Sequence, residues 1–319
     1  MRNARILIAE SAGFSPRALH TLRAAGVAVT EADLTRSDLM RAIGSADVVW
    51  VRLRTRVDAA LLSKAPRLRF LVTATTGLDH IALDETERRG IRVLSLRGHT
   101  NFLRGIHATA EHTLALTLAL LRKLPCAVFH TTGGGWNRDL FRGHEIFGRT
   151  VGIVGWGRIG RMVHTLFEAF GARVLVCDPY ATDVAAPRVE LHELLSRSEI
   201  VTLHVNLCEG TRRMIGPAEF SSTRPGAWLI NTSRGDIVDE DALLTSLCSG
   251  RLAGAALDVL CEEDAQGMES SALVQYARVH NNLILTPHIG GCTFESMAAT
   301  EEFLAERLVA ALREQLCAA

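Results

Sequence analysis

Residues 151–160 constrain the fold of this chain more than any other stretch. They read VGIVGWGRIG, a short apolar run that leads into three glycines spaced G-x-G-x-x-G. The apolar run predicts a buried parallel strand, and residues 161–170 have the apolar spacing of a helix. A second predicted strand covers 173–177 and ends at Asp178. Strand, glycine turn, helix, strand and acid in this order predict a dinucleotide-binding unit.

Each glycine has its own expected role in that unit. Gly155 permits a tight turn, Gly157 lets a pyrophosphate approach the backbone, and Gly160 lets helix and strand pack closely. Asp178 is placed to accept hydrogen bonds from a ribose and to repel a 2′-phosphate, so we expect NAD rather than NADP. Arg158 would soften that preference. A tight turn in an α/β domain that binds no ligand is the simpler alternative.

The composition narrows the class of protein. A chain of 319 residues is long enough for two domains of ordinary size, and a hydrophobic content of 48% supports substantial cores. Lysine plus arginine equals aspartate plus glutamate at 35 each, and no basic stripe is present. This balance argues against nucleic acid as a partner.

The sequence also carries expectations about location. Arg2 and Arg5 precede only a short apolar run, which does not resemble a signal peptide. The most apolar predicted helix, 108–121, is too short for a membrane span and contains Glu111 and His112. Seven cysteines without a C-x-x-C pair predict reduced thiols. We therefore expect a cytoplasmic protein with no membrane contact and no metal site.

Predicted strands and helices alternate along the first part of the chain. The predicted strands are 6–10, 27–32, 48–53, 68–74 and 91–96. The predicted helices are 15–26, 37–44 with Ser37 as its cap, 59–64 and 85–90. Strict alternation predicts a parallel sheet with both faces covered.

The second part follows the same plan after a long apolar helix. That helix covers 108–123 and is expected to stop before Pro125, with an irregular segment over 131–143. The later strands are 200–205, 227–232, 255–260 and 283–286, and the helices between them are 190–196, 217–222 and 239–249. An amphipathic helix over 296–316 is expected to return to the first domain. The fold class is therefore α/β with doubly wound parallel sheets, one domain formed by 1–97 plus about 292–319 and the other by 98–291.

Reactive residues follow several predicted strands of the second domain. Arg234 follows 227–232, Asp258 and Glu263 lie at and beyond the end of the next strand, and His288 follows the last. Ligands of parallel sheets bind beyond the carboxyl ends of the strands, so these side chains are candidates for one site.

The three residue types suit hydride transfer to a 2-oxo acid. A guanidinium holds the carboxylate and polarises the carbonyl, a histidine acts as general acid, and a carboxylate stabilises the imidazolium. Arg234, His288 and Glu263 supply these parts. Each residue also has a simpler interpretation when it is considered alone. Arg234 would form a surface ion pair, His288 would be a loop histidine, and Glu263 would belong to the solvated acidic stretch 262–264.

Together these segments resemble the D-isomer-specific 2-hydroxyacid dehydrogenase family, which includes phosphoglycerate, glyoxylate/hydroxypyruvate and D-lactate dehydrogenases. The matching motifs, in order, are VGIVGWGRIG with Asp178, LINTSRGDIVDEDAL, AGAALDVLCEE and NLILTPHIGG. The resemblance implies two Rossmann- or flavodoxin-like domains around a cleft, with 1–97 plus 292–319 binding substrate and 98–291 binding NAD. It implies an NAD-dependent oxidoreductase that is a homodimer, with 108–123 and 131–143 as its dimerisation region.

The resemblance also implies roles for single residues. Arg234, Glu263 and His288 are the expected catalytic residues, with His288 donating a proton in reduction. Thr76 and Gly77 are expected to offer backbone N–H groups to the substrate carboxylate, which Arg234 and His288 also contact. The expected cofactor contacts are Gly155, Gly157, Arg158, Ile159, Gly160, Asp178, Thr232, Ser233, Arg234, Asp258, His288 and Gly290.

The chain departs from the family pattern in places that concern the substrate. Asp264 stands where a proline usually follows the catalytic glutamate, and the segment 98–111 is long and carries Arg104 and His107. Arg104 is therefore a candidate for binding a second anionic group, such as a phosphate, with a solvated hinge loop as the alternative. Relatives that act as NAD-sensing corepressors leave a binding protein as an alternative to an enzyme.

Overall fold

The chain folds into two compact units. The computed structural model describes residues 4–263 and 267–317. The first unit is Met1–Gly105 with Thr293–Ala319, and the second is Ile106–Cys292. The chain therefore enters the second unit after Gly105 and leaves it after Cys292.

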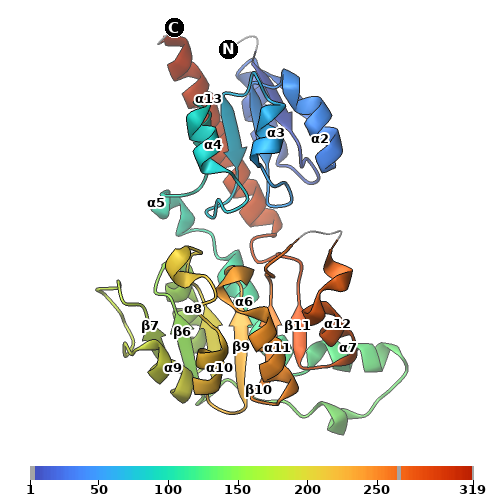
Figure 1. The fold of residues 1–319 in the computed structure, drawn as a ribbon, viewed down its shortest axis with the longest axis vertical. Coiled ribbons are helices and arrows are strands. Elements are labelled where there is room, and N and C mark those ends of the chain that lie inside the picture. The colour runs from blue at the N-terminus through green and yellow to red at the C-terminus, as the bar shows by residue number, and fades with distance from the viewer. Residues whose placement is uncertain (1–3, 264–266, 318–319) are drawn as a thin grey trace. The chain divides into compact units, whose positions relative to one another are not determined.

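The first unit is coloured blue to teal in Figure 1, with its C-terminal helix in red. It contains a wholly parallel sheet of strand order β2-β1-β3-β4-β5. Its strands are β1 Arg5–Ile8, β2 Ala28–Glu31, β3 Val48–Val51, β4 Phe70–Thr73 and β5 Arg92–Leu94. Its helices are α1 Pro16–Ala24, α2 Arg36–Ala42, α3 Ala59–Ser63, α4 Leu83–Arg88, α5 Thr100–Leu103 and α13 Phe294–Cys317.

The second unit contains a wholly parallel sheet of order β11-β10-β9-β8-β6-β7. Its strands are β6 Thr150–Val154, β7 Arg173–Cys177, β8 Ile200–Leu203, β9 Ala227–Asn231, β10 Leu252–Leu257 and β11 Leu283–Leu285. Its helices are α6 Ala108–Leu121, α7 Leu124–Thr132, α8 Arg158–Ala169, α9 Leu191–Arg197, α10 Pro217–Ser222, α11 Glu240–Cys248 and α12 Ala272–Val279. In each sheet the strand that comes first in the chain, β1 or β6, has a neighbour on both sides. The second strand is added on one side of it and all later strands on the other, so the order of the strands reverses next to β1 and next to β6.

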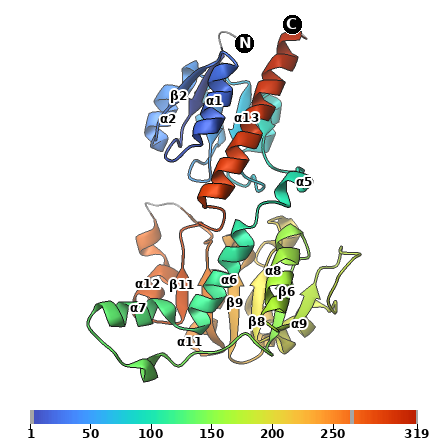
Figure 2. The ribbon, with the colours of Figure 1, turned by 180° about the vertical axis from the view of Figure 1, so that it is seen from behind.

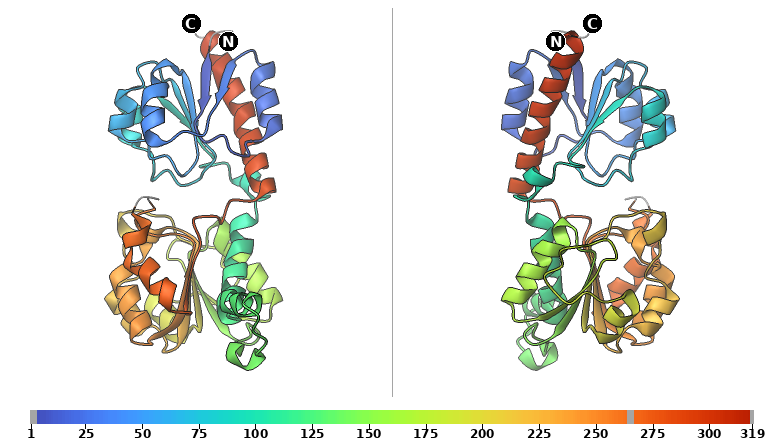
Figure 3. Two further views of the ribbon diagram at one scale, coloured as in Figure 1. Left: turned by 90° about the vertical axis from the view of Figure 1, so that its right-hand side faces the viewer. Right: turned by 90° about the vertical axis from the view of Figure 1, so that its left-hand side faces the viewer.

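Helices cover both faces of the second sheet, as the edge-on views of Figure 3 show. One face packs on α6 and α8, through residues such as Leu116 and Phe167 (Figure 2). The other packs on α9, α10, α11 and α12, through residues such as Leu194, Leu243 and Leu273. Burial on both faces explains why the strands read as continuous apolar runs. The prediction of doubly wound parallel sheets is confirmed.

The helix α13 is fixed to the first unit, beside α1 (Figure 2). The carboxylate of Glu301 is 1% exposed and accepts hydrogen bonds from the guanidinium of Arg52 and from the N–H of Ser15. This buried charge therefore has its partners, as buried charges require.

The first unit also extends past the expected boundary at residue 97. The ring of Phe102 stacks on Phe303 of α13 with centroids 4.1 Å apart, and His99 meets the same ring edge-on at 5.0 Å. These contacts attach α5 to the first unit, so its boundary falls after Gly105.

Several local predictions need correction. The apolar helix stops before Pro125 as predicted, since α6 ends at Leu121, but a second helix follows that was not predicted. Pro125 lies in the first turn of this helix, α7, where its missing N–H costs nothing. Lys123, in a left-handed conformation, separates α6 from α7. The cap of α2 is Thr35, which accepts from the N–H of Asp38, and not Ser37.

The lengths of the helices bear on the expectation that the protein does not span a membrane. Among the described residues, no single helix is long and apolar enough to cross a membrane. Residues 100–121 and 124–132 reach that length and composition only as a pair, bent by 64°.

Candidate active site

The glycine turn between β6 and α8 has the geometry of a phosphate-binding loop. Gly155 has a φ of +100°, and a Cβ there would lie 2.6 Å from the backbone oxygen of His204. A Cβ on Gly160 would collide with the backbone oxygen of Gly155, whereas a Cβ on Gly157 would enter open space. The first and third glycines are thus required by the fold, and the second leaves room at the start of α8 for a diphosphate. The turn fits a dinucleotide.

The carboxylate of Asp178 braces this turn from the end of β7. Its Oδ2 accepts from the N–H of Trp156 at 2.8 Å, and its Oδ1 accepts from the N–H of Tyr180 at 2.9 Å. Each oxygen keeps further lone pairs for a ribose hydroxyl. The guanidinium of Arg158, at the first position of α8, donates to the backbone oxygen of Ile106 at 2.7 Å.

The residues after β9 present Arg234. Asn231, at the strand end, accepts from the N–H and hydroxyl of Ser233 and donates to the backbone oxygen of Arg234 at 2.9 Å. The hydroxyls of Thr232 and Thr113 lie 2.8 Å apart and join this strand end to α6. These hydrogen bonds fix the turn on both sides, so the side chain of Arg234 extends from a rigid backbone.

A close backbone contact joins the β9 loop to the β10 loop. A Cβ on Gly235 would collide with the backbone of Leu260. Glycine at this position thus lets the segments that carry Arg234 and Glu263 run side by side.

The acid–base pair is formed by His288 and Glu263. The Nδ1 atom of His288 lies 2.6 Å from Oε2 of Glu263. An ionised carboxylate only accepts, so Nδ1 carries a proton and Nε2 remains for proton transfer. His288 also has a φ of +53°, which is uncommon for a residue with a side chain. Asp264, which follows Glu263, lies outside the described residues.

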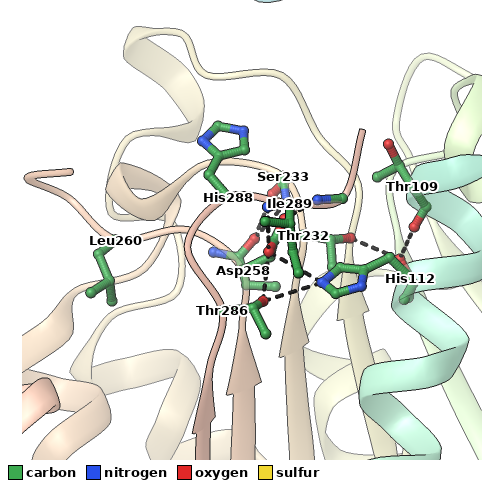
Figure 4. A network of polar contacts seen from close by, with 12 residues as sticks. Thr109, His112, Thr232, Ser233, Asp258, Leu260, Thr286, His288 and Ile289 are labelled. Carbon is green, nitrogen blue, oxygen red and sulfur yellow. Dashed lines mark hydrogen bonds and ion pairs between the residues drawn. The ribbon is translucent and has the colours of Figure 1, made fainter. Parts of the chain in front are cut away.

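Asp258 holds the backbone around His288 (Figure 4). The N–H of His288 donates to the backbone oxygen of Asp258 at 2.8 Å. The carboxylate accepts from the N–H groups of Ile289 and Gly290 at 2.9 and 2.7 Å, and from the hydroxyl of Thr286 at 2.5 Å. Burial raises the pKa of Asp258, but these hydrogen bonds and one from His112 outweigh it and hold the pKa below its usual range.

His112 belongs to this network, although the sequence assigned it no role. Its Nε2 lies 3.1 Å from Oδ1 of Asp258 and 3.2 Å from the hydroxyl of Thr286. The signal in the sequence was a histidine within the apolar helix that begins at Ala108.

The expected substrate residues Thr76, Gly77 and Arg104 belong to the first unit. The hydroxyl of Thr75 donates to the backbone oxygen of Gly77 at 2.8 Å, and Nε of Arg97 donates to that of Thr76 at 3.4 Å. Arg104 is exposed at the end of α5. Arg97 therefore brings a positive charge to the expected carboxylate-binding loop.

No metal centre accompanies these groups in the described part of the chain. Over residues 4–263 and 267–317, no three His, Cys, Asp or Glu side chains are grouped so that they could hold an ion.

Comparisons with known proteins place this geometry in a family. The family model "D-isomer specific 2-hydroxyacid dehydrogenase, NAD binding domain" matches residues 114–290. D-3-phosphoglycerate dehydrogenase of Mycobacterium tuberculosis is 36% identical over 282 residues, which cover 87% of this chain and 51% of that protein. Glyoxylate reductase of Thermococcus gammatolerans is 34% identical over 296 residues, 88% of this chain and 84% of that protein.

A solved structure matches nearly the whole fold. D-lactate dehydrogenase from Aquifex aeolicus, complexed with NAD and lactic acid, superposes with a TM-score of 0.82 at 27% identity, covering 98% of this chain and 96% of that one. The chain spans about half the length of the phosphoglycerate dehydrogenases that it matches. The family match, the relatives and the glycine turn agree: this chain belongs to the D-isomer specific 2-hydroxyacid dehydrogenase family, and residues 114–290 are its NAD binding domain.

Proposed function

We propose that this protein is an NAD-dependent D-2-hydroxyacid dehydrogenase, an oxidoreductase that interconverts a small 2-oxo acid and the corresponding 2-hydroxy acid. One observation carries the proposal. The imidazole of His288 is held at Nδ1 by Glu263, at 2.6 Å, in the unit that contains the glycine turn. The family and the names of the relatives support the same reaction class.

Bound NAD(H) would supply or accept the hydride. The protein's own residues orient the acid and move the proton. The guanidinium of Arg234 would hold the substrate carboxylate and polarise the carbonyl oxygen. In reduction Nε2 of His288 would donate a proton to the forming alkoxide, and in oxidation it would take that proton back. The carboxylate of Glu263 would stabilise the imidazolium and fix the ring tautomer.

The cofactor would lie along the carboxyl ends of the strands of the second unit. The turn from Gly155 to Gly160, including Arg158 and Ile159, would bind the diphosphate at the start of α8. Asp178 would accept from the adenosine ribose, which favours NAD over NADP. The ends of β9, β10 and β11 would meet the nicotinamide half, through Thr232, Ser233, Arg234, Asp258, His288 and Gly290.

The first unit would supply the rest of the substrate site. The N–H groups of Thr76 and Gly77 would bind the carboxylate common to all 2-oxo acids. A second anionic group, such as a phosphate or distal carboxylate, would meet Arg104. The exposed position of Arg104 at the end of α5 leaves its charge available to such a group.

The partners in this proposal are the acid and a second copy of the chain, without nucleic acid or membrane. In α7 and the segment after it, Phe129 is 82% exposed and Trp136 is 91% exposed. Such large exposed apolar side chains on one segment mark an interaction surface. We assign this surface to a homodimer. Cys126, Cys177, Cys208, Cys248 and Cys261 are free thiols, which fits the reducing cytoplasm.

The direct test is a substrate panel. The purified protein is mixed with NADH and glyoxylate, pyruvate, hydroxypyruvate or doubly anionic 2-oxo acids, and the loss of NADH absorbance is followed. We expect turnover of at least one acid, and the product should be the D isomer by chiral chromatography. NADH binding without turnover of any acid would contradict the enzymatic proposal and favour a binding protein.

A further inference from the structure

We propose that His112 is a positioning residue for His288 and acts through Asp258. This inference deepens the proposed function and rests on it. No role for His112 follows from the catalytic steps above. Its imidazole belongs to α6 and joins the site through the carboxylate of Asp258 and the hydroxyl of Thr286 (Figure 4).

The protonation of the contact follows from the hydrogen bonds around it. Asp258 is 1% exposed and its carboxylate accepts from four donors: Nε2 of His112, the hydroxyl of Thr286, and the N–H groups of Ile289 and Gly290. The hydroxyl of Thr286 already donates to Oδ1, so its lone pairs face Nε2 of His112. Both neighbours of Nε2 are thus acceptors, and Nε2 must carry a proton.

The same carboxylate fixes the turn that carries His288. It binds the two N–H groups that follow His288, while the backbone oxygen of Asp258 binds the N–H of His288 itself. His288 has a φ of +53°, a conformation that side-chain-bearing residues keep only where the surroundings enforce it. Removing a donor from the carboxylate would weaken the hold on this strained residue, and Nε2 would lose its alignment.

His112 also sits where α6 meets that turn. A Cβ on Gly290 would lie 2.9 Å from Oδ2 of Asp258, and 3.5 Å from Cγ2 of Thr109 and 3.7 Å from Cδ2 of His112. The carboxylate therefore leaves no room for a side chain at this position, and the turn lies within van der Waals reach of α6. The chain enters the unit at Ile106 and leaves it at Cys292, just outside these two contacts. His112 therefore lies near both the first and the last residues of the second unit, and it contacts the carboxylate of Asp258 that holds the turn of His288.

The test is a series of variants at position 112 with a control on the same helix. His112→Leu keeps volume but removes the donor. His112→Asn keeps polarity, but its amide is too short to reach Asp258. His112→Gln restores a donor at about the distance of Nε2. Thr117→Val is the control, because Thr117 is buried and its hydroxyl donates to the backbone oxygen of Thr113 within α6, away from Asp258.

Two readouts separate positioning from general damage. In the ligand-free protein, hydrogen exchange of a peptide covering 284–292 should be about five- to tenfold faster in H112L and H112N, the effect of losing one hydrogen bond. In assays, kcat should fall about 10- to 100-fold, as for a misaligned catalytic group. The KM for NADH should change less than about threefold. H112Q and T117V should match the wild type in both readouts.

Each outcome decides between the claims. Wild-type exchange and kcat in H112L and H112N would overturn the role of His112, as would an H112Q variant that is as impaired as H112L. Should H112L fail to fold, the comparison of H112N with H112Q still measures the donor. A wild-type protein that reduces no acid would overturn the proposed function, whereas the exchange experiment would still test the link from His112 to His288.

Discussion

The Nδ1 atom of His288 lies 2.6 Å from Oε2 of Glu263, although the two residues are 25 positions apart in the chain. This contact joins the loop after β10 to the loop after β11 and leaves Nε2 as the ring nitrogen for proton transfer. His288→Ala should therefore lower kcat by about 10²- to 10⁴-fold, the usual contribution of a positioned proton donor. NADH affinity, measured by fluorescence titration, should fall much less than kcat, because His288 would be one of several contacts to the cofactor. Normal turnover in this variant would remove His288 from the mechanism.

Glu263→Gln tests the charge in the same pair. The amide oxygen can still accept from Nδ1–H, but it carries no charge to stabilise the imidazolium. kcat for reduction should therefore fall, though by less than in His288→Ala, because the ring keeps its tautomer and its position. Steady-state rates with NADH and a 2-oxo acid check this. A kcat equal to that of the wild type would mean that the Glu263 charge does not act on His288.

Asp178 predicts the choice of cofactor. Its two oxygens each accept a backbone N–H, from Trp156 and Tyr180, so Asp178→Ala would both remove the charge and loosen the turn. Asp178→Asn is the sharper variant because it keeps an acceptor oxygen. The wild type should use NADH far better than NADPH, and D178N should narrow that gap because its side chain no longer repels a 2′-phosphate. Equal kcat/KM for both cofactors in the wild type would refute the assignment.

The sequence predicted the two parallel sheets because their signals are local. Apolar runs such as those of β3 and β6 are buried on both faces, and glycine turns separate strand from helix. The end of α6 before Pro125 was predicted correctly, but α7 was not predicted, because a proline is compatible both with the end of one helix and with the first turn of the next. The structure alone shows that Lys123 makes the bend between them.

The role of His112 could not be predicted from the sequence for a different reason. A histidine in an apolar helix acquires a partner only when that helix is docked against a particular strand end, here that of β10. Its contact with Asp258 spans 146 positions in the chain, and no local pattern encodes it. Glu263 and His288 were easier to place since both follow predicted strands that are neighbours in the sheet.

Asp258 should make stability depend on acid pH. Burial raises its pKa, but its hydrogen bonds outweigh this and hold the pKa below the ordinary value of 3.8. A depressed carboxyl pKa stabilises the fold fully above that ordinary value, and the contribution is lost as pH falls through the lower folded value. Asp258→Asn should therefore have a lower midpoint of thermal unfolding at pH 7, with a difference that shrinks at acid pH. Asp139→Asn, which removes an exposed carboxylate, should show no such pattern.

The exposed apolar side chains of α7 and the following segment predict the assembly state. Phe129 and Trp136 would be buried against the partner chain, so replacing both with serine removes apolar contact from each side of a symmetric interface. The double variant should sediment as a monomer at concentrations where the wild type is a dimer. Val279→Ser, at an exposed apolar side chain of α12, is the control. A wild type that is monomeric at all concentrations would contradict the assignment.

The last prediction concerns the two arginines of the segment 97–104. Arg97 donates to the backbone oxygen of Thr76, in the loop expected to bind the carboxylate common to all 2-oxo acids. Arg104 is exposed at the end of α5 and is the candidate for a second anion. Doubly anionic 2-oxo acids should therefore exceed pyruvate and glyoxylate in kcat/KM.

The two arginine variants should separate these roles. Arg104→Ala should reduce the preference for doubly anionic acids by about 10- to 100-fold, as expected for a lost charged hydrogen bond. It should leave kcat/KM for pyruvate little changed, because only the distal contact is removed. Arg97→Ala should lower kcat/KM for both kinds of acid alike, since it loosens a loop that both would use. If Arg104→Ala lowers both equally, Arg104 supports the fold of the segment and binds no second anion.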